Sequence, residues 1–245
     1  MTRRLATVSI AASSLALLAF PAASPAGTAS TVSSGDRQRV LYDAAPGEAN
    51  ELLVEVSRNS RAVRLTDGGA AIAVGPGCEA QSDARVVCRL NVRVRLVQVS
   101  LGDGDDRAEA TTSNPAGAQV NIVGGDGEDL LRGRGPTRFN FGGDGGDDTL
   151  SGSEGPDVLR GGAGNDFASG RGGDDLLIGD SGRDVLRGRF GRDRIFGGLG
   201  SDRVDSRDLP ELRDGVVSCG PGRDRLTADE VDGPIIVGCE GVRVP

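Results

Sequence analysis

Residues 143–205 form seven successive rows of nine residues without a gap: GDGGDDTLS, GSEGPDVLR, GGAGNDFAS, GRGGDDLLI, GDSGRDVLR, GRFGRDRIF and GGLGSDRVD. Every row has glycine at positions one and four. Position six is always aspartate and position eight is always aliphatic, from Asp148 and Leu150 to Asp202 and Val204. A fixed period of this kind is typical of a solenoid, in which stacked repeats supply a core that no single repeat can bury.

Each row is predicted to form one turn and one short strand. The six glycine-rich positions favour a turn, because glycine is used where φ is positive and loses the most entropy in regular structure. The last three positions alternate sides as a strand does, so position eight faces the core. Two rows then make one coil, and residue i lies beside residue i+18 at the strand spacing of about 4.8 Å.

This stacking places the position-six aspartates in two ladders. One ladder contains Asp148, Asp166, Asp184 and Asp202, and the other contains Asp157, Asp175 and Asp193. Carboxylates so close repel one another unless hard cations lie between the rungs, and sites with six to eight oxygen ligands select Ca²⁺. The three adjacent pairs of one ladder and the two of the other predict five calcium sites.

These rows resemble the glycine-rich nonapeptide of the RTX (repeats-in-toxin, hemolysin-type calcium-binding) family, G-G-x-G-x-D-x-U-x. Unbroken matches run from Gly161 to Asp166 and, upstream, from Gly124 to Asp129. The resemblance implies an all-β fold, a parallel β-roll or right-handed β-solenoid, in which turn carbonyls and position-six aspartates of neighbouring coils bind Ca²⁺. In this chain we assign only the position-six aspartates as expected calcium ligands.

Two further segments have the spacing of the repeat outside the strict rows. Gly102 to Asp106 reproduces the G-x-G-x-D core after a predicted strand, and Gly220 to Asp224 restores the spacing once after the register breaks. The predicted calcium ligands are therefore Asp106, Asp129, Asp148, Asp157, Asp166, Asp175, Asp184, Asp193, Asp202 and Asp224.

The rows also depart from the family pattern at identifiable places. Position two, normally glycine, is another residue in five rows, and we expect weak or empty calcium sites around Arg171 and Arg189. Between residues 133 and 142 one row has Pro136 in place of glycine and Arg138 in place of aspartate. A defect in the ladder is expected there.

The first 26 residues are predicted to be a secretory signal peptide. Arg3 and Arg4 precede an apolar run from Leu5 to Phe20, and small residues lead to a cleavage site after Ala26. A membrane anchor is the alternative, but this run of about 16 residues is shorter than the roughly 20 that a spanning helix needs. No second hydrophobic segment follows. We expect a secreted, extracellular chain without a membrane span.

The net charge of −8 becomes −10 when the two arginines of the signal are removed. This acidic charge argues against nucleic acid as a partner and fits a cation binder. The chain has no histidine, no G-x-S-x-G and no H-E-x-x-H, so no familiar hydrolase centre is present and we expect no enzyme. The alternative is an unfamiliar carboxylate site between residues 36 and 123.

Four cysteines in an exported chain predict two disulfides. Three connectivities are possible, and Cys78–Cys88 with Cys219–Cys239 is favoured because each pair brackets one local segment. A zinc site is disfavoured because the chain has neither a C-x-x-C pair nor a histidine.

These observations divide the chain into four parts. The signal covers residues 1–26, and residues 27–123 form either a separate β-domain or, as we favour, irregular solenoid coils that act as an N-terminal cap. The β-roll covers residues 124–205, and a C-terminal cap with a degenerate repeat and a disulfide covers residues 206–245.

Two hypotheses for function follow. The first is a calcium-binding protein whose repeats bind several Ca²⁺ ions and fold on doing so. The second is a calcium-stabilised extracellular adhesion scaffold that binds an envelope polysaccharide or protein. Outward positions seven and nine, for example Phe167 and Arg187, would carry that binding.

Overall fold

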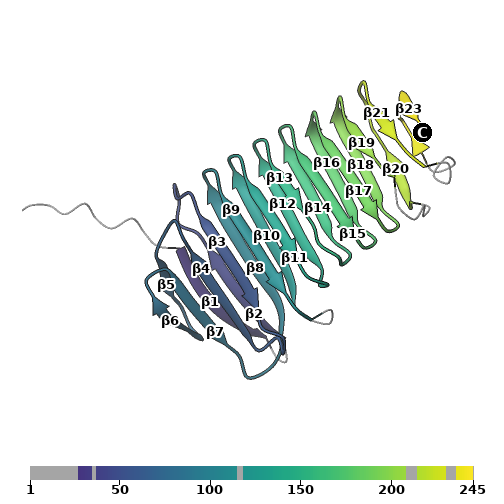
Figure 1. Cartoon of the computed structure of the whole chain (residues 1–245). Coiled ribbons are helices and arrows are strands. Elements are labelled where there is room, and N and C mark those ends of the chain that lie inside the picture. The colour runs from purple at the N-terminus through teal and green to yellow at the C-terminus, as the bar shows by residue number, and fades with distance from the viewer. Residues whose placement is uncertain (1–26, 35–36, 115–117, 208–213, 230–235, 245) are drawn as a thin grey trace, which may run out of the picture.

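The computed structural model describes residues 27–34, 37–114, 118–207, 214–229 and 236–244, so the predicted signal peptide lies outside the described residues. All regular structure in these ranges is β-strand, and the chain winds from one end of an elongated solenoid to the other (Figure 1). Within the same ranges, no helix is long and apolar enough to cross a membrane.

The strands lie in two sheets. The first sheet has 11 strands in the order β5 (Ile72–Val74), β1 (Gly27–Ser34), β2 (Arg37–Asp43), β8 (Val94–Asp103), β10 (Gln119–Asp126), β12 (Phe139–Gly145), β14 (Val158–Ala163), β16 (Leu176–Gly182), β18 (Arg194–Gly200), β20 (Val216–Ser218) and β22 (Ile236–Val237). The second sheet has 12 strands in the order β6 (Cys78–Ser82), β7 (Arg85–Arg89), β4 (Ala62–Asp67), β3 (Glu51–Val56), β9 (Arg107–Thr112), β11 (Leu130–Arg134), β13 (Thr149–Ser151), β15 (Phe167–Gly172), β17 (Val185–Phe190), β19 (Arg203–Asp205), β21 (Arg225–Thr227) and β23 (Gly241–Arg243).

Successive strands from β8 onward alternate between the two sheets, so one strand from each sheet makes one coil. Neighbouring coils pair in parallel with the predicted offset of 18 residues, as Leu159 with Leu177 and Ala168 with Leu186. The prediction of an all-β solenoid of stacked parallel coils is therefore confirmed. Several strands are longer than the three residues expected, because the backbone of positions two and three also pairs with the next coil.

The core is a narrow stack of aliphatic side chains between the sheets. In the strict repeats it is built from position eight, and each of these side chains has no exposed surface: Leu150, Leu159, Ala168, Leu177, Leu186, Ile195 and Val204. Since each strand contributes one such side chain, every coil depends on its neighbours for burial.

Both sheets continue into the segment 27–123. Strands β2 and β3 pair in parallel with β8 and β9, which extends the coils toward the amino-terminal end (Figure 1). Beyond them the pairing becomes antiparallel, between β1 and β2, β3 and β4, β4 and β7, and β6 and β7. These hairpins cover the edge that the first regular coil would otherwise expose, and an uncovered edge invites pairing with other chains.

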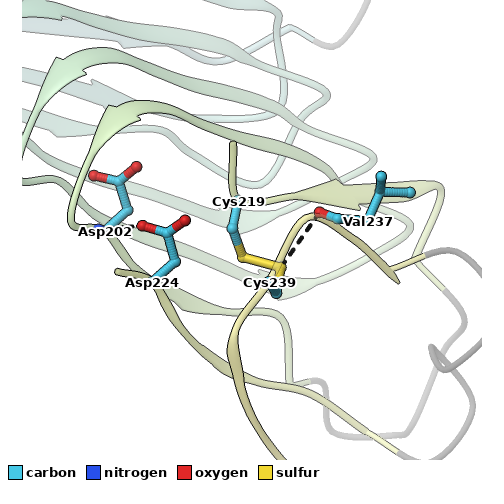
Figure 2. The surroundings of a disulfide bond; sticks show 5 residues. All are labelled: Asp202, Cys219, Asp224, Val237 and Cys239. Carbon is cyan, nitrogen blue, oxygen red and sulfur yellow. Dashed lines mark hydrogen bonds between the residues drawn. A yellow bond between two sulfur atoms is a disulfide. The ribbon is translucent and has the colours of Figure 1, made fainter. Parts of the chain in front are cut away.

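Both favoured disulfides are present. Cys78–Cys88 joins β6 to β7 in the amino-terminal hairpins. Cys219–Cys239 ties the last coils together, and Figure 2 shows it beside Asp202 and Asp224. The disulfides therefore lie toward opposite ends of the solenoid.

The backbone at position two keeps a left-handed conformation at four of the five non-glycine residues. The φ angle is 76° at Asp144, 76° at Arg171, 73° at Asp180 and 80° at Arg189. These four replacements therefore leave the turn conformation intact but place strain on the backbone, since residues other than glycine disfavour positive φ.

Candidate metal centre

The position-six aspartates lie in the turns that lead from the first sheet to the second and back. Asp184, for example, lies between β16 and β17. The turn requires glycine at position four: Gly164 has a φ of 137°, and a Cβ there would collide with the carbonyl of Gly146 in the neighbouring coil.

One ladder of aspartates runs along the turns that lead from the first sheet to the second. The backbone amide of each aspartate donates a hydrogen bond to Oδ1 of the aspartate in the next coil, at 2.8–2.9 Å. The amide of Asn50 starts the series at 2.6 Å from Asp106 Oδ1. The members are Asp106, Asp129, Asp148, Asp166, Asp184, Asp202 and Asp224.

A second ladder runs along the opposite turns, with amide-to-carboxylate distances of 2.7–2.9 Å. Its members are Asp157, Asp175, Asp193 and Asp214. The structure therefore places all ten predicted aspartates in the two ladders. It also adds Asp214, which sequence reasoning missed because the spacing after Asp193 is 21 residues rather than 18. The apolar Val216 and Val217 that follow it are the sequence signal for this row, although the buried Val217, which pairs with Ile195, lies three residues after the aspartate and not two.

The second ladder begins only at Asp157, because the row before it departs from the repeat. The backbone amide of Phe139 donates a hydrogen bond to Asp157 Oδ1 at 2.8 Å. The row between residues 133 and 142 therefore contributes an amide to this ladder but no carboxylate. This is the position of the expected defect. Asp157 also differs in its other oxygen, because Oδ2 accepts hydrogen bonds from the amide and the hydroxyl of Ser153 at 2.6 and 3.1 Å.

The second carboxylate oxygen of the other ladder residues is the distinctive feature of this site. In eight described aspartates Oδ2 is buried and has no hydrogen-bond partner within the protein: Asp106, Asp129, Asp148, Asp166, Asp175, Asp184, Asp202 and Asp224. Each of these residues is at most 2% exposed. Burying a carboxylate oxygen without a partner is strongly unfavourable, so this array calls for a positively charged ligand.

Position-one glycines make room for these oxygens. A Cβ on Gly143 would stand within 3.0 Å of both Asp148 Oδ2 and the carbonyl oxygen of Gly161 in the next coil. A Cβ on Gly179 would meet Asp184 Oδ2 and the next coil's carbonyl in the same way. Carboxylate and carbonyl oxygens from successive coils thus converge beside Gly143 and Gly179, and oxygen ligands of this kind are those that hard cations prefer.

Burial raises the pKa of eight ladder carboxyl groups, those of Asp106, Asp129, Asp148, Asp157, Asp166, Asp175, Asp184 and Asp202. Desolvation is the largest cause in each case, and neighbouring aspartates add to it: the pKa rises to about 7 for Asp148 and Asp184 and to about 9 for Asp175. Without a cation, Asp148, Asp184 and Asp175 therefore retain protons near neutral pH.

The residues fit a hard cation such as Ca²⁺. The described residues contain no group of three or more Asp, Glu, Cys or His side chains around a common metal position. Each rung contributes one carboxylate, so a cation between two rungs would take its other ligands from turn carbonyls. Such a site differs from a zinc centre, which is built from side-chain nitrogen and sulfur.

Comparison with known families agrees with this architecture. The sequence model described as RTX calcium-binding nonapeptide repeat (4 copies) matches residues 142–177 and 169–204. This stretch of the chain is therefore an array of RTX calcium-binding nonapeptide repeats, and the resemblance found in the sequence is confirmed. Searches of curated proteins and of solved structures gave no significant match.

Proposed function

We propose that this chain is a secreted, non-enzymatic calcium-binding protein whose repeats fold when they bind Ca²⁺. The observation that carries the proposal is the row of eight buried Oδ2 atoms without partners, six of them beside a position-one glycine. The cations would lie along the two ladders, held by the position-six aspartates and by turn carbonyls. When bound, Ca²⁺ supplies the positive charge that these carboxylates lack.

Coupling of binding to folding follows from the same array. In the unfolded chain the aspartates are hydrated, whereas in the folded coils they are buried and close to one another. A cation that binds only the folded coils adds its binding free energy to their stability. Extracellular calcium modules commonly work at about 10⁻⁴–10⁻³ M, so the repeats would stay unfolded in the cytoplasm and fold outside the cell.

Secretion is supported by two features. The first 26 residues have the charge and apolar pattern of a signal peptide. All four cysteines form disulfides, which persist in oxidising compartments.

The proposal is tested by far-ultraviolet circular dichroism of the chain from residue 27 onward, with both disulfides intact. Titration with Ca²⁺ is expected to convert a largely disordered spectrum into a β spectrum at or below about millimolar concentration. Mg²⁺ is expected to be much less effective, because it demands a small octahedral site and dehydrates reluctantly. A complete β spectrum in chelator, unchanged by calcium, would contradict folding on binding.

A further inference from the structure

Four arginines gather at one recess on the turn edge near the carboxyl-terminal end. Arg183, Arg203, Arg223 and Arg225 line a hollow of about 420 Å³ together with Ser201 and Val185 and parts of two ladder residues. Arg203 and Arg225 are paired neighbours on β19 and β21, so their side chains leave adjacent strands about 4.8 Å apart. Arg183 and Arg223 come from the turns beside them.

These arginines have no carboxylate partner in the described part of the chain. Elsewhere in the same ranges arginines do form ion pairs, as Arg134 does with Glu109 at 2.7 Å and Arg207 with Asp205 at 2.8 Å. No acidic oxygen of a described residue lies within 4.0 Å of the four guanidinium groups. Four like charges around one hollow repel one another, so the arrangement favours an anion.

The two ladder aspartates that border the hollow do not fill this role. Asp184 and Asp202 are 0% and 2% exposed, and Oδ1 of each is occupied by a backbone amide at 2.8–2.9 Å. Their carboxylates belong to the interior of the turns. The guanidinium groups, by contrast, belong to exposed residues and can approach a ligand from solvent.

Ser201 supplies a fifth polar group. Its hydroxyl oxygen accepts a bond from the amide of Arg223 at 3.4 Å, which leaves the hydroxyl hydrogen to be donated. Guanidinium forks and a hydroxyl are the groups that bind the oxygens of phosphate and sulfate, often with two parallel hydrogen bonds from one arginine.

We propose that this hollow, the arginine recess, is a binding site for a tetrahedral oxyanion, a sulfate or phosphate group that is either free or carried on a polysaccharide. The site lies on an acidic chain with a net charge of −8, so binding depends on these local arginines and not on the charge of the whole molecule. A polymer bearing such groups at intervals would fix the solenoid to a surface by its carboxyl-terminal end.

The test measures binding of sodium sulfate by isothermal titration calorimetry and of heparin, a sulfated polysaccharide, by retention on a column. The disulfide-intact protein is kept in calcium throughout, so the solenoid is folded whether or not calcium drives folding. The variant Arg203→Gln/Arg225→Gln is expected to weaken binding by about tenfold or more, because charge-assisted hydrogen bonds are lost.

A matched pair of variants controls for general charge. Arg183→Gln removes a recess arginine, and Arg192→Gln removes the arginine at the same position of the next row, on the opposite turn edge. Arg183→Gln is expected to weaken binding and Arg192→Gln to leave it unchanged. Circular dichroism of each variant checks that the β spectrum is retained.

Each result decides the proposal. Sulfate binding that is weakened only by recess variants supports a site for the free ion, and heparin binding alone with the same variant pattern supports a polymer-borne group. Absence of both, or equal loss in Arg183→Gln and Arg192→Gln, overturns the recess as a site. These results are independent of whether calcium causes folding.

Discussion

The backbone amide of Asp148 lies 2.8 Å from Oδ1 of Asp166, the aspartate one coil further along the chain. Each ladder carboxylate therefore has two distinct oxygens. Oδ1 closes a hydrogen bond between coils, whereas Oδ2 of Asp166 is buried without a partner. The coil-to-coil bond holds the carboxylate in place, and the second oxygen is the one available to a cation.

Removing one ladder charge tests this division of roles. Asn at position 166 keeps an oxygen for the amide bond but loses the negative charge, so Asp166→Asn is expected to weaken calcium binding by about tenfold. Asp157→Asn should have a smaller effect, because Ser153 already occupies Oδ2 of Asp157. Calcium titration monitored by circular dichroism compares the two variants. Equal losses of affinity in the two variants would show that an Oδ2 atom without a hydrogen-bond partner does not make an aspartate a better calcium ligand.

A pair of neighbouring glycines tests the space beside the carboxylate. Gly143→Ala would push a methyl group against Asp148 Oδ2 and the Gly161 carbonyl, and we expect it to cost about 1–3 kcal/mol and to weaken calcium binding. The nearest neighbour of a Cβ on Gly142 is Asp144 Oδ1 at 3.5 Å, which is an ordinary contact. Gly142→Ala is therefore the control, and it should leave both thermal stability and calcium affinity close to wild type.

The raised pKa values predict how stability depends on pH. In the metal-free protein, burial raises the pKa of Asp148 and Asp184 to about 7 and of Asp175 to about 9, from 3.8. The folded state then binds protons more tightly than the unfolded state, so its stability is fully present below about pH 4 and is lost as pH rises toward 7–9. Denaturation in chelator should show more folded protein at pH 5 than at pH 8.

Calcium is expected to reverse this trend. Cations compete with protons for the same oxygens, so calcium affinity should increase between pH 5 and pH 8. Measurement of the calcium midpoint at several pH values checks the direction. An affinity independent of pH would mean that the ladder carboxylates are not the ligands.

The left-handed residues at position two offer a test of strain. Arg171 has a φ of 76°, which glycine adopts freely, so Arg171→Gly is expected to stabilise the protein by about 0.5–1 kcal/mol. Arg187 lies in β17, where its guanidinium packs over the Phe167 ring at 5.2 Å, and Arg187→Gly should destabilise. Thermal melts in saturating calcium compare the two. A loss of stability in both variants would mean that the side chain of Arg171 contributes more than its backbone strain costs.

The strict period made most of the fold predictable. The aspartate and aliphatic positions of the row, Asp148 and Leu150 in the first one, recur every nine residues. This spacing determines both the offset between coils and which side chains of each strand face the core. Asp214 was missed because the spacing between its row and that of Asp193 is three residues longer than one coil. The antiparallel hairpins around Cys78–Cys88 were not predicted either, since alternating strands do not specify the direction of pairing.

Other details depend on contacts that no spacing reveals. The bond from Ser153 to Asp157 needs the turn geometry, and so do the positive φ angles at Asp144 and Arg171. The arginine recess combines residues from two strands and two turns, and only the 18-residue offset and the irregular row before Arg223 bring them together.

The offset of 18 residues between coils of the strict rows also determines how the length of this molecule can vary. Removing residues 161–178 would join Arg160 to Gly179 and shorten the solenoid by one coil, about 4.8 Å, with every later residue still in its own sheet. Removing nine residues would move each later strand to the opposite sheet and carry the disulfide-linked end to the other side. Whole coils are thus interchangeable parts, and duplication or loss of pairs of rows gives longer or shorter rods with the same two ends.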